Sequence, residues 1–372
     1  MEVKELFCVL LRDALWGSIT PLDVSKDQLL KVIKLAKAQT VLGLIANEVL
    51  KREELASLFS LQYRDRLNYF VQGNFYNSQK QNGSLATLVL KLREQGIDPI
   101  LLKGQGVARN YPMPELRQCG DLDIYVGPEN YAKACEMVSA MSNKDESHKD
   151  VENQKHYHTK VGHAYIEVHQ YTDVYYPKRL NNVYQKISDE GLNKGLVPLD
   201  FCGVKVLTPT ADFNAFFIFN HFWHHFITDG VGLRHLCDWT LLLHANYGKL
   251  DEAFLADSLC KMKMMKQWKV FGCIVVDYLG LPQEEMPFYD AKYRKLAGRV
   301  LELMHIEGNF GHENSKRYKR PKGYLSGKMY SFFMRSRRNM KVFRLFPKEA
   351  LLQNYRMFTS GIATMFKEKF SK

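Results

Sequence analysis

Two aspartates separated by one residue form the pattern with the most specific chemistry in this chain. The segment 121–126 alternates acidic and apolar residues with a period of two, which predicts a β-strand. On such a strand Asp121 and Asp123 point to one face, and the apolar residues beside them point to the core. Two carboxylates this close repel each other unless a cation lies between them. Their hard oxygens suit Mg²⁺ or Mn²⁺, so the pattern predicts a divalent-metal site for phosphoryl chemistry.

A third carboxylate is expected on a neighbouring strand. In the segment 165–169, Glu167 lies between two apolar residues that point to the opposite face of the strand. We therefore predict that Asp121, Asp123 and Glu167 converge as catalytic residues and metal ligands. The alternative is a set of solvated acids on an exposed strand face, which an Asp-x-Asp pair taken alone would favour.

A glycine-rich turn follows a short apolar run at 97–102 that is typical of a buried strand. The turn consists of Lys103, Gly104, Gln105 and Gly106. Gly104 lets the backbone turn close to a phosphate, and Lys103 offers a mobile positive charge, so this segment is predicted to bind a nucleotide. It matches neither the G-x-G-x-x-G pattern of dinucleotide sites nor the lysine-hydroxyl ending of a P-loop.

Five further residues are candidates for contacts with a nucleotide or an acceptor. They are Arg117, His169, His221, Arg234 and Asp238. Arg117 either reaches a nucleotide phosphate or pairs with a nearby acid. His169 shares the strand face of Glu167, and His221 either packs within an apolar helix or lines the substrate cleft. Arg234 and Asp238 are four residues apart, which suits an ion pair on one helix face, or they face the cleft.

The order of these patterns along the chain predicts an α+β fold. Helical spacing dominates residues 1–95 and returns in residues 206–310, whereas the strands lie in residues 96–205. We expect a small mixed β-sheet as the core, flanked by an N-terminal and a C-terminal helical region. The C-terminal region is expected to form the substrate side. Residues 311–372 form a basic, aromatic tail.

Several local elements follow from the spacing of apolar residues and glycines. Two separate helices are predicted at 63–75 and 83–95. The segments 156–161 and 164–169 predict a β-hairpin, because a glycine lies between them. A polar connection is expected at 143–154.

The positive charge of the chain is concentrated in its last residues. The net charge is +12, yet residues 316–372 alone contain 16 basic and 2 acidic residues, so the rest of the chain is slightly acidic. Aromatic and basic residues alternate in 329–346, which favours reversible contact with an anionic membrane. The alternatives are that the aromatic residues pack on the protein body, or that the tail binds nucleic acid.

Cysteine usage and apolar runs favour a cytoplasmic location. The seven cysteines are odd in number and form no C-x-x-C pair, which is typical of reduced thiols. Charged residues interrupt the first apolar run, so we interpret it as a helix and not as a signal peptide. No run of 18 apolar residues occurs, and the tail is thus the predicted route to a membrane surface.

These residues together resemble the polymerase-β-like nucleotidyltransferase superfamily, which has a glycine turn, an Asp-x-Asp strand and an acid on a later strand. More closely, the chain resembles a bacterial family of nucleotidyltransferases, many without an assigned substrate. The likeness covers most of residues 1–310. The matching segments are Leu102-Lys103-Gly104, Arg117, Asp121 with Asp123, Glu167-Val168-His169, His221 and Leu233-Arg234-His235-Leu236-Cys237-Asp238.

The resemblance implies a metal-dependent enzyme that uses Mg²⁺ or Mn²⁺. Such an enzyme moves a nucleoside monophosphate from an NTP such as ATP to a small or glycan-linked acceptor and releases pyrophosphate. Under it, Asp121 and Asp123 hold the metals, and Glu167 completes the second metal's shell and helps to deprotonate the acceptor. Lys103 and the turn 104–106 hold the triphosphate.

Two further points qualify the resemblance. Relatives occur beside surface-polysaccharide genes, which implies a role in polysaccharide biosynthesis. The superfamily usually has Gly-Ser or Gly-Gly at the turn, whereas this chain has Gly104-Gln105, so a serine hydroxyl contact to phosphate is missing. The alternative function is a nucleic-acid-modifying or RNA-binding protein that uses the basic tail, although no RNA-recognition motif occurs and the body is slightly acidic.

Overall fold

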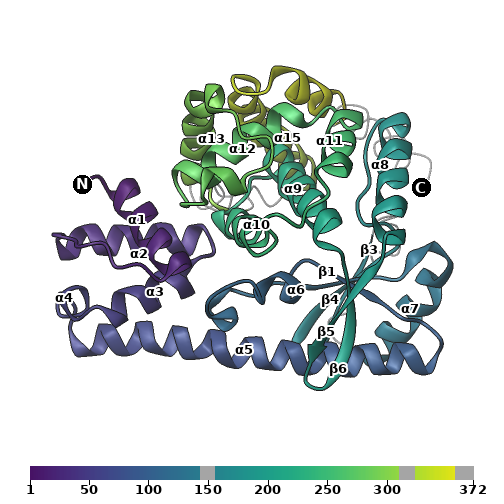
Figure 1. Cartoon of the computed structure of the whole chain (residues 1–372), viewed down its shortest axis with the longest axis horizontal. Coiled ribbons are helices and arrows are strands. Elements are labelled where there is room, and N and C mark those ends of the chain that lie inside the picture. The colour runs from purple at the N-terminus through teal and green to yellow at the C-terminus, as the bar shows by residue number, and fades with distance from the viewer. Residues whose placement is uncertain (143–155, 310–322, 357–372) are drawn as a thin grey trace.

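The computed structural model describes residues 1–142, 156–309 and 323–356 of the chain. These ranges form an α+β fold in which one mixed β-sheet is flanked by helices from both ends of the chain, as the sequence predicts (Figure 1). The polar connection predicted at 143–154 lies outside the described residues. Within the described ranges, every helix is too short or too polar to cross a membrane.

The N-terminal region begins with four helices that pack through their apolar faces. They are α1 (Val3–Trp16), α2 (Lys26–Ala38), α3 (Leu42–Lys51) and α4 (Glu53–Ala56). Ser25 caps the start of α2, because its side chain accepts from the backbone N–H of Gln28 while the Gln28 side chain binds back to Ser25. Gly17 ends α1 in the left-handed conformation that glycine adopts without strain.

A single long helix, α5 (Leu61–Glu94), connects the N-terminal helices to the sheet, and Figure 1 shows it running beneath both. The prediction of two helices at 63–75 and 83–95 is therefore wrong. Gly83 stays helical although glycine lowers helix stability by about 1 kcal/mol. Tertiary packing overrides this cost, because the two halves of α5 are held by two different hydrophobic cores.

The sheet has six strands in the order β3-β4-β2-β1-β6-β5. The strands are β1 (Ile100–Leu102), β2 (Leu122–Tyr125), β3 (His156–Val161), β4 (Ala164–His169), β5 (Leu196–Phe201) and β6 (Val204–Pro209). Neighbours β2 and β4 are parallel, as are β1 and β6, whereas the other neighbours are antiparallel. The sheet is therefore mixed, and its central strands β2 and β4 carry the carboxylates that the sequence singled out.

The hairpin of β3 and β4 confirms the sequence prediction, whereas the hairpin of β5 and β6 and the helix α8 (Lys178–Asn193) were not predicted. Pro198 lies within β5 and argues against a strand when it is considered from the sequence alone. The structure resolves this conflict, because β5 is an edge strand and its open side needs no N–H donor.

The two faces of the sheet have different roles. One face packs its apolar residues, Leu122, Ile124, Ile166 and Val168, against α5 and α7 (Gly127–Met141), and these residues are almost completely buried. The opposite face carries Asp123 and Glu167, since neighbouring residues on a strand alternate in direction. The carboxylates therefore face the C-terminal helices and not the core under the sheet.

The C-terminal helical region packs above that polar face (Figure 1). Its helices are α9 (Ala211–Thr228), α10 (Leu233–Ala245), α11 (Glu252–Lys261), α12 (Met265–Asp277), α13 (Arg294–Glu307), α15 (Tyr324–Phe343) and a segment at 347–356. Short helical turns, α6 (Gln105–Ala108), η1 (Pro114–Leu116), η2 (Gln283–Glu285) and η3 (Ala291–Tyr293), connect the larger elements. One hydrophobic core joins this region to the N-terminal helices, so the two ends of the chain enclose the sheet together.

Candidate active site

The register of β2 and β4 places two carboxylates side by side. Asp123 is paired with Glu167 across these parallel strands, and Asp121 directly precedes β2. Asp123 is 3% exposed, Glu167 is partly buried, and Asp121 is exposed. A buried acid beside a partly buried acid needs compensating positive charge, which neighbouring elements supply.

The turn after β1 supplies the first compensating charge. Lys103 and Gly104 both have positive φ, of 39° and 53°, and the ψ of −121° at Gly104 is a conformation that residues with a Cβ avoid. This turn directs the Lys103 side chain across the sheet. Its Nζ lies 3.0 Å from Asp123 Oδ1 and donates to His221 Nε2 of α9, also at 3.0 Å.

His169 supplies a second contact to the same carboxylate oxygen. Its Nε2 lies 3.0 Å from Asp123 Oδ1 and 3.4 Å from Glu167 Oε2, and the ring is 4% exposed. The sequence predicted that His169 shares a strand face with Glu167, and the structure places it between the two acids. It is thus positioned to orient the carboxylates.

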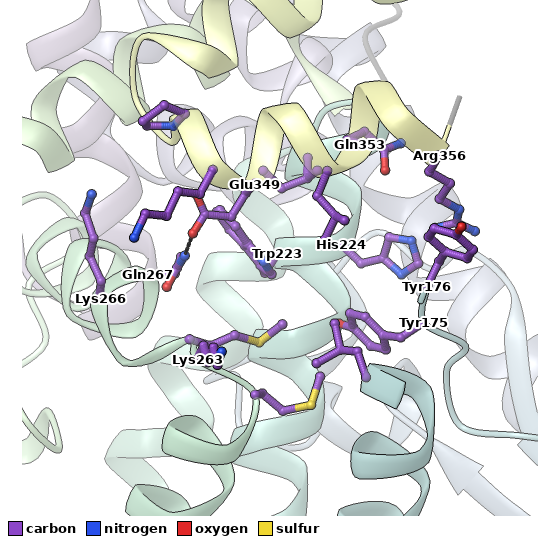
Figure 2. Close-up of a pocket in the computed structure, with 17 residues that line it drawn as sticks. Tyr175, Tyr176, Trp223, His224, Lys263, Lys266, Gln267, Glu349, Gln353 and Arg356 are labelled. Carbon is purple, nitrogen blue, oxygen red and sulfur yellow. Dashed lines mark hydrogen bonds between the residues drawn. The ribbon is translucent and has the colours of Figure 1, made fainter. Parts of the chain in front are cut away.

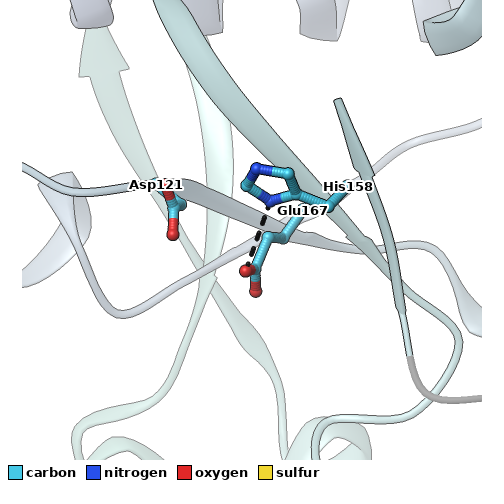
Figure 3. A group of neighbouring side chains, drawn as sticks. All are labelled: Asp121, His158 and Glu167. Atoms are coloured by element: carbon cyan, nitrogen blue, oxygen red, sulfur yellow. Dashed lines mark ion pairs between the residues drawn. The ribbon is translucent and has the colours of Figure 1, made fainter. Parts of the chain in front are cut away.

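His158 is a member of the cluster that the sequence interpretation missed. It lies on β3 opposite Glu167, with its Nδ1 3.5 Å from Glu167 Oε1. Figure 3 shows Asp121, His158 and Glu167 pointing toward one another. The signal was available, because the pairing of residues 161 and 164 in the predicted hairpin places residue 158 opposite residue 167.

The charges of the cluster perturb its pKa values in opposite directions. Although the Asp121 residue is exposed, partial desolvation of its carboxyl group by the surrounding cluster and the negative charges of Glu167 and Asp123 raise its pKa. Burial alone would raise the pKa of Glu167, but hydrogen bonds from His158 and His169 hold it well below its usual range. The hydrogen bond to Glu167 raises the pKa of His158. The raised pKa of Asp121 indicates that the three acids are crowded, which is the condition that a bound cation relieves.

The donor atoms of the cluster suit a divalent metal. Ligand atoms of Asp121, His158 and Glu167 lie within 4.8 Å of one another, and so do those of Asp123, Glu167 and His169. Glu167 belongs to both groups, so the three predicted carboxylates are brought together. An oxygen-rich set of this kind fits Mg²⁺ or Mn²⁺, with the nitrogen donors favouring Mn²⁺ more than Mg²⁺.

Arg117 does not point toward the carboxylate cluster. It forms a bidentate ion pair with Asp238, with Nε 2.7 Å from Oδ1 and Nη2 2.8 Å from Oδ2. The hydroxyl of Tyr111 also donates to Asp238 Oδ1, at 2.7 Å. Arg117 and Asp238 are 5% and 3% exposed. Of the two alternatives for Arg117, the structure therefore favours pairing with an acid.

Arg234 does not form the ion pair with Asp238 that their spacing suits, because Asp238 pairs with Arg117. Arg234 instead donates from Nη1 to the backbone oxygen of Gln118 at 2.7 Å. Its buried Nε has no hydrogen-bond partner among the residues that the structure describes, and burial beside Arg117 lowers the pKa of Arg234. Arg234 thus supports the loop that leads from η1 into β2 and not the acid that lies four residues away.

Gln105 is the one residue of the glycine-rich turn whose side chain is directed into the protein. It is 4% exposed, and its Nε2 donates to Asn82 Oδ1 of α5 at 2.6 Å. The thiol of Cys119 donates to its Oε1. Gly106 packs close to Thr208 and Leu101. The half of the turn that faces the cluster therefore consists of Lys103 and Gly104.

The histidines of α9 lie on two adjacent sides of the helix. His221 accepts from Lys103, as described above, and its ring lies 4.5 Å from that of His225. His224 points instead toward Asp173, with 3.0 Å between Nδ1 and Oδ2. The structure therefore places His221, and not His224, at the carboxylate cluster, which fits the second of the two alternatives given for His221 better than simple packing.

The chain has a match among protein families. A family model described as "Uncharacterised nucleotidyltransferase" matches residues 25–271, a range that includes the sheet, the carboxylate cluster and α9 with α10. No curated protein and no solved structure matches the chain.

Proposed function

We propose that this chain, which belongs to the uncharacterised nucleotidyltransferase family matched by residues 25–271, transfers a nucleoside monophosphate from an NTP to a small or glycan-linked acceptor. Family membership supports nucleotidyl transfer in general. The observation that carries the proposal further is the convergence of Asp121, Asp123 and Glu167 beside the Lys103 turn. This combination provides a site for divalent cations next to a site for phosphate.

Each residue of the cluster has a proposed role. Asp121, Asp123 and Glu167 would hold Mg²⁺ or Mn²⁺, which when bound neutralises charge on the triphosphate. Lys103 exchanges its contact with Asp123 for one with a phosphate oxygen, and Gly104 leaves room for that oxygen. His169 keeps the carboxylates of Asp123 and Glu167 oriented.

The proposed reaction is a displacement at the α-phosphorus of the NTP. A hydroxyl or phosphate oxygen of the acceptor forms a bond to this phosphorus while the bond to the bridging oxygen of pyrophosphate breaks. The acceptor proton passes to a carboxylate of the cluster or to water, and pyrophosphate leaves. The acceptor class follows from the resemblance described above, which also implies a role in surface-polysaccharide biosynthesis.

The proposal is tested by nucleotide binding and turnover in the full chain. We expect non-hydrolysable analogues of the four NTPs to bind in the presence of Mg²⁺, with a preference for one base, in isothermal calorimetry. Asp123→Asn should abolish this binding and any pyrophosphate release from the NTPs, because it removes the charge that holds the cation. Asp65→Asn, at an exposed position on α5, is the matched control. Unchanged binding and turnover in Asp123→Asn, with an unchanged melting temperature, would contradict the proposal.

We further propose that α15 holds the enzyme reversibly on an anionic membrane. Its residues Met329, Phe332, Phe333, Met340 and Phe343 are 44–66% exposed. At about 100° per residue these five side chains fall within an arc of about 100° and form an exposed apolar stripe along the helix. On the other side, Val342 is buried, and Arg338 binds Glu307 and backbone oxygens at the end of α9. The expectation that tail aromatics pack on the body thus fits Phe346, which is buried, but not this outer stripe.

Charge beside the apolar stripe supports a membrane over nucleic acid as the partner. Arg337 and Arg344 are exposed and flank the stripe, which suits acidic lipid headgroups above an apolar layer. Binding of single-stranded RNA usually uses a basic groove that follows the backbone, whereas α15 lines none of three cavities that the described residues form. Phe332→Asp with Phe333→Asp should abolish sedimentation with acidic liposomes, and Tyr69→Asp, at an exposed position on α5, should not. RNA binding that the double variant loses, without liposome binding by the wild type, would favour the alternative.

A further inference from the structure

A cavity of about 520 Å³ lies beside the carboxylate cluster but outside it. Its walls come from the segment before α8, from α9, from the connection between α11 and α12, and from the helical segment 347–356 (Figure 2). This volume lies within the range of about 300–1,000 Å³ that is typical of small-molecule sites. None of the residues that the proposed transfer reaction uses lines it.

The interior of the cavity is mostly apolar. Its apolar and aromatic lining includes Tyr175, Trp223, Ile227, Met262, Met264 and Leu352. Tyr175 is held in place because its hydroxyl donates to Asn220 Oδ1 at 2.5 Å, whereas the two methionines are flexible side chains that adapt to a ligand. A lining that combines held aromatic rings with adaptable methionines suits an extended apolar chain.

Three lysines surround this apolar interior. Lys263, Lys266 and Lys348 line the cavity, are exposed, and have no carboxylate partner within the described ranges. The acid on the same wall, Glu349, is engaged by the side-chain amide of Gln267. The cavity therefore combines an apolar interior with an excess of positive charge at its mouth, which is complementary to an amphipathic anion.

The backbone at Lys263 gives an independent reason to assign a role to its side chain. Lys263 follows the end of α11 with φ of 58°, the left-handed conformation that glycine usually takes at this position. A side chain there costs roughly 1 kcal/mol relative to glycine. The chain nevertheless places a lysine at this position, and that lysine lines the cavity.

The cavity adjoins the candidate active site through α9. His221 contacts Lys103 of the carboxylate cluster, and His224, three residues later, lines the cavity. Side chains three residues apart on a helix are neighbours, with Cβ atoms about 5–6 Å apart. The two sites therefore share α9, with His221 at the carboxylate cluster and His224 at the cavity.

We infer that this cavity binds an amphipathic phosphate, that is, an apolar chain that carries a phosphate group. The apolar chain lies against Trp223 and the methionines, and the lysines bind the phosphate as point charges. The identification of this ligand as the acceptor of the transferred nucleotidyl group rests on the proposed function. The binding itself does not, because it needs neither NTP nor metal.

The test is direct binding of dodecyl phosphate, below its micelle concentration, to the full chain without nucleotide or divalent metal. We expect saturable binding at one site in isothermal calorimetry. Inorganic phosphate should not bind, and dodecyl maltoside, which has the same chain and a neutral head, should bind at least about tenfold more weakly. If inorganic phosphate binds as tightly as dodecyl phosphate, the cavity is a simple anion site and the proposal of an amphipathic ligand is wrong.

Two pairs of variants separate the cavity from the general surface. Leu352→Asp places an acid in the apolar lining and should abolish binding, whereas Leu351→Asp, on the same helical segment but outside the cavity, should not. Lys263→Asn keeps a residue that tolerates the left-handed backbone and should weaken binding about fivefold, whereas Lys249→Asn should have no effect. Equal effects within each pair would overturn the assignment.

A loss of transferase activity in Asp123→Asn with unchanged dodecyl phosphate binding would show that the cavity and the carboxylate cluster are separate sites. Conversely, transferase activity without dodecyl phosphate binding would reject the cavity proposal and leave the proposed function intact.

Discussion

The ammonium group of Lys103 lies 3.0 Å from Asp123 Oδ1, although the two residues come from the turn after β1 and from the middle of β2. The antiparallel pairing of β1 with β2 places Leu102 opposite Asp123, so the next residue along the chain reaches the carboxylate. The same ammonium group contacts His221 of α9. Lys103 therefore connects the sheet, the glycine-rich turn and the C-terminal helices.

Lys103→Met should raise the KM for NTP by a larger factor than it lowers kcat. The variant loses a charged contact to phosphate, which corresponds to a rise in KM of about ten- to hundredfold. Without metal, it should also lower the melting temperature, because Asp123 stays buried and loses its ammonium partner. Steady-state kinetics and thermal unfolding measure both effects, with Lys91→Met on the exposed face of α5 as the control. An unchanged KM would reject the phosphate contact.

Glu167→Gln should lower the affinity for Mn²⁺, measured by electron paramagnetic resonance of the free ion. Glu167 belongs to both groups of ligand atoms, so its loss affects every ion that the cluster holds. We expect a decrease of at least about tenfold, the size that removal of a metal-site group typically gives. Glu54→Gln, at an exposed position on α4, should bind Mn²⁺ like the wild type. Equal affinities in all three proteins would show that the cluster does not bind the ion.

Arg117→Ala should destabilise the fold by about 3–5 kcal/mol, because it leaves the buried carboxylate of Asp238 without its partner. Urea unfolding measures this change, and Arg109→Ala provides an exposed arginine nearby as the control. The double variant Arg117→Met with Asp238→Leu should recover much of the loss, since it removes both charges. A stable Arg117→Ala protein with impaired NTP binding would instead assign Arg117 to the nucleotide.

His305→Leu should make the stability of the protein less dependent on pH between pH 7 and pH 4.5. His305 of α13 packs against Phe7, and within the described ranges its Nε2 has no hydrogen-bond partner. Burial lowers the pKa of His305 to about 4. The positive charge of Lys4 lowers this pKa further, whereas Glu302 opposes the effect.

In the unfolded chain the pKa of a histidine is about 6.5, so between pH 6.5 and pH 4 only the unfolded chain binds the proton. His305 therefore has no effect on the free energy of unfolding above about pH 6.5. As the pH falls toward 4, it lowers this free energy by up to about 3 kcal/mol. Urea unfolding at several pH values measures the slope, and His163→Leu in the β3–β4 turn is the exposed control. A slope equal to that of the wild type in His305→Leu would contradict this account.

The sequence alone determined the features that depend on local periodicity. The alternation around Asp123 and around Glu167 predicted two strands with acids on one face, because side chains on a strand alternate in direction whatever the fold. The hairpin around Gly162 followed from the same regularity. The helical flanks were predicted because apolar residues recur with the helical period over long segments.

The tertiary structure decided which residues meet across large separations in the chain. Arg117 pairs with Asp238, and Lys103 contacts His221, although more than a hundred residues separate the members of each pair. Spacing favoured Arg234 as the partner of Asp238, because only neighbours on one helix can be judged from the sequence. In the folded protein the guanidinium of Arg117 reaches both carboxylate oxygens of Asp238, whereas that of Arg234 donates to the backbone of Gln118.

The same limit explains the continuous helix α5 and the cavity behind α9. Gly83 suggested an interruption, but packing on two separate cores outweighs the small local preference of one glycine. The cavity is formed by segments that include Tyr175, Trp223, Lys263 and Leu352, which are far apart in the sequence. No local pattern relates these residues, so their common site exists only once the C-terminal helices have packed around α9.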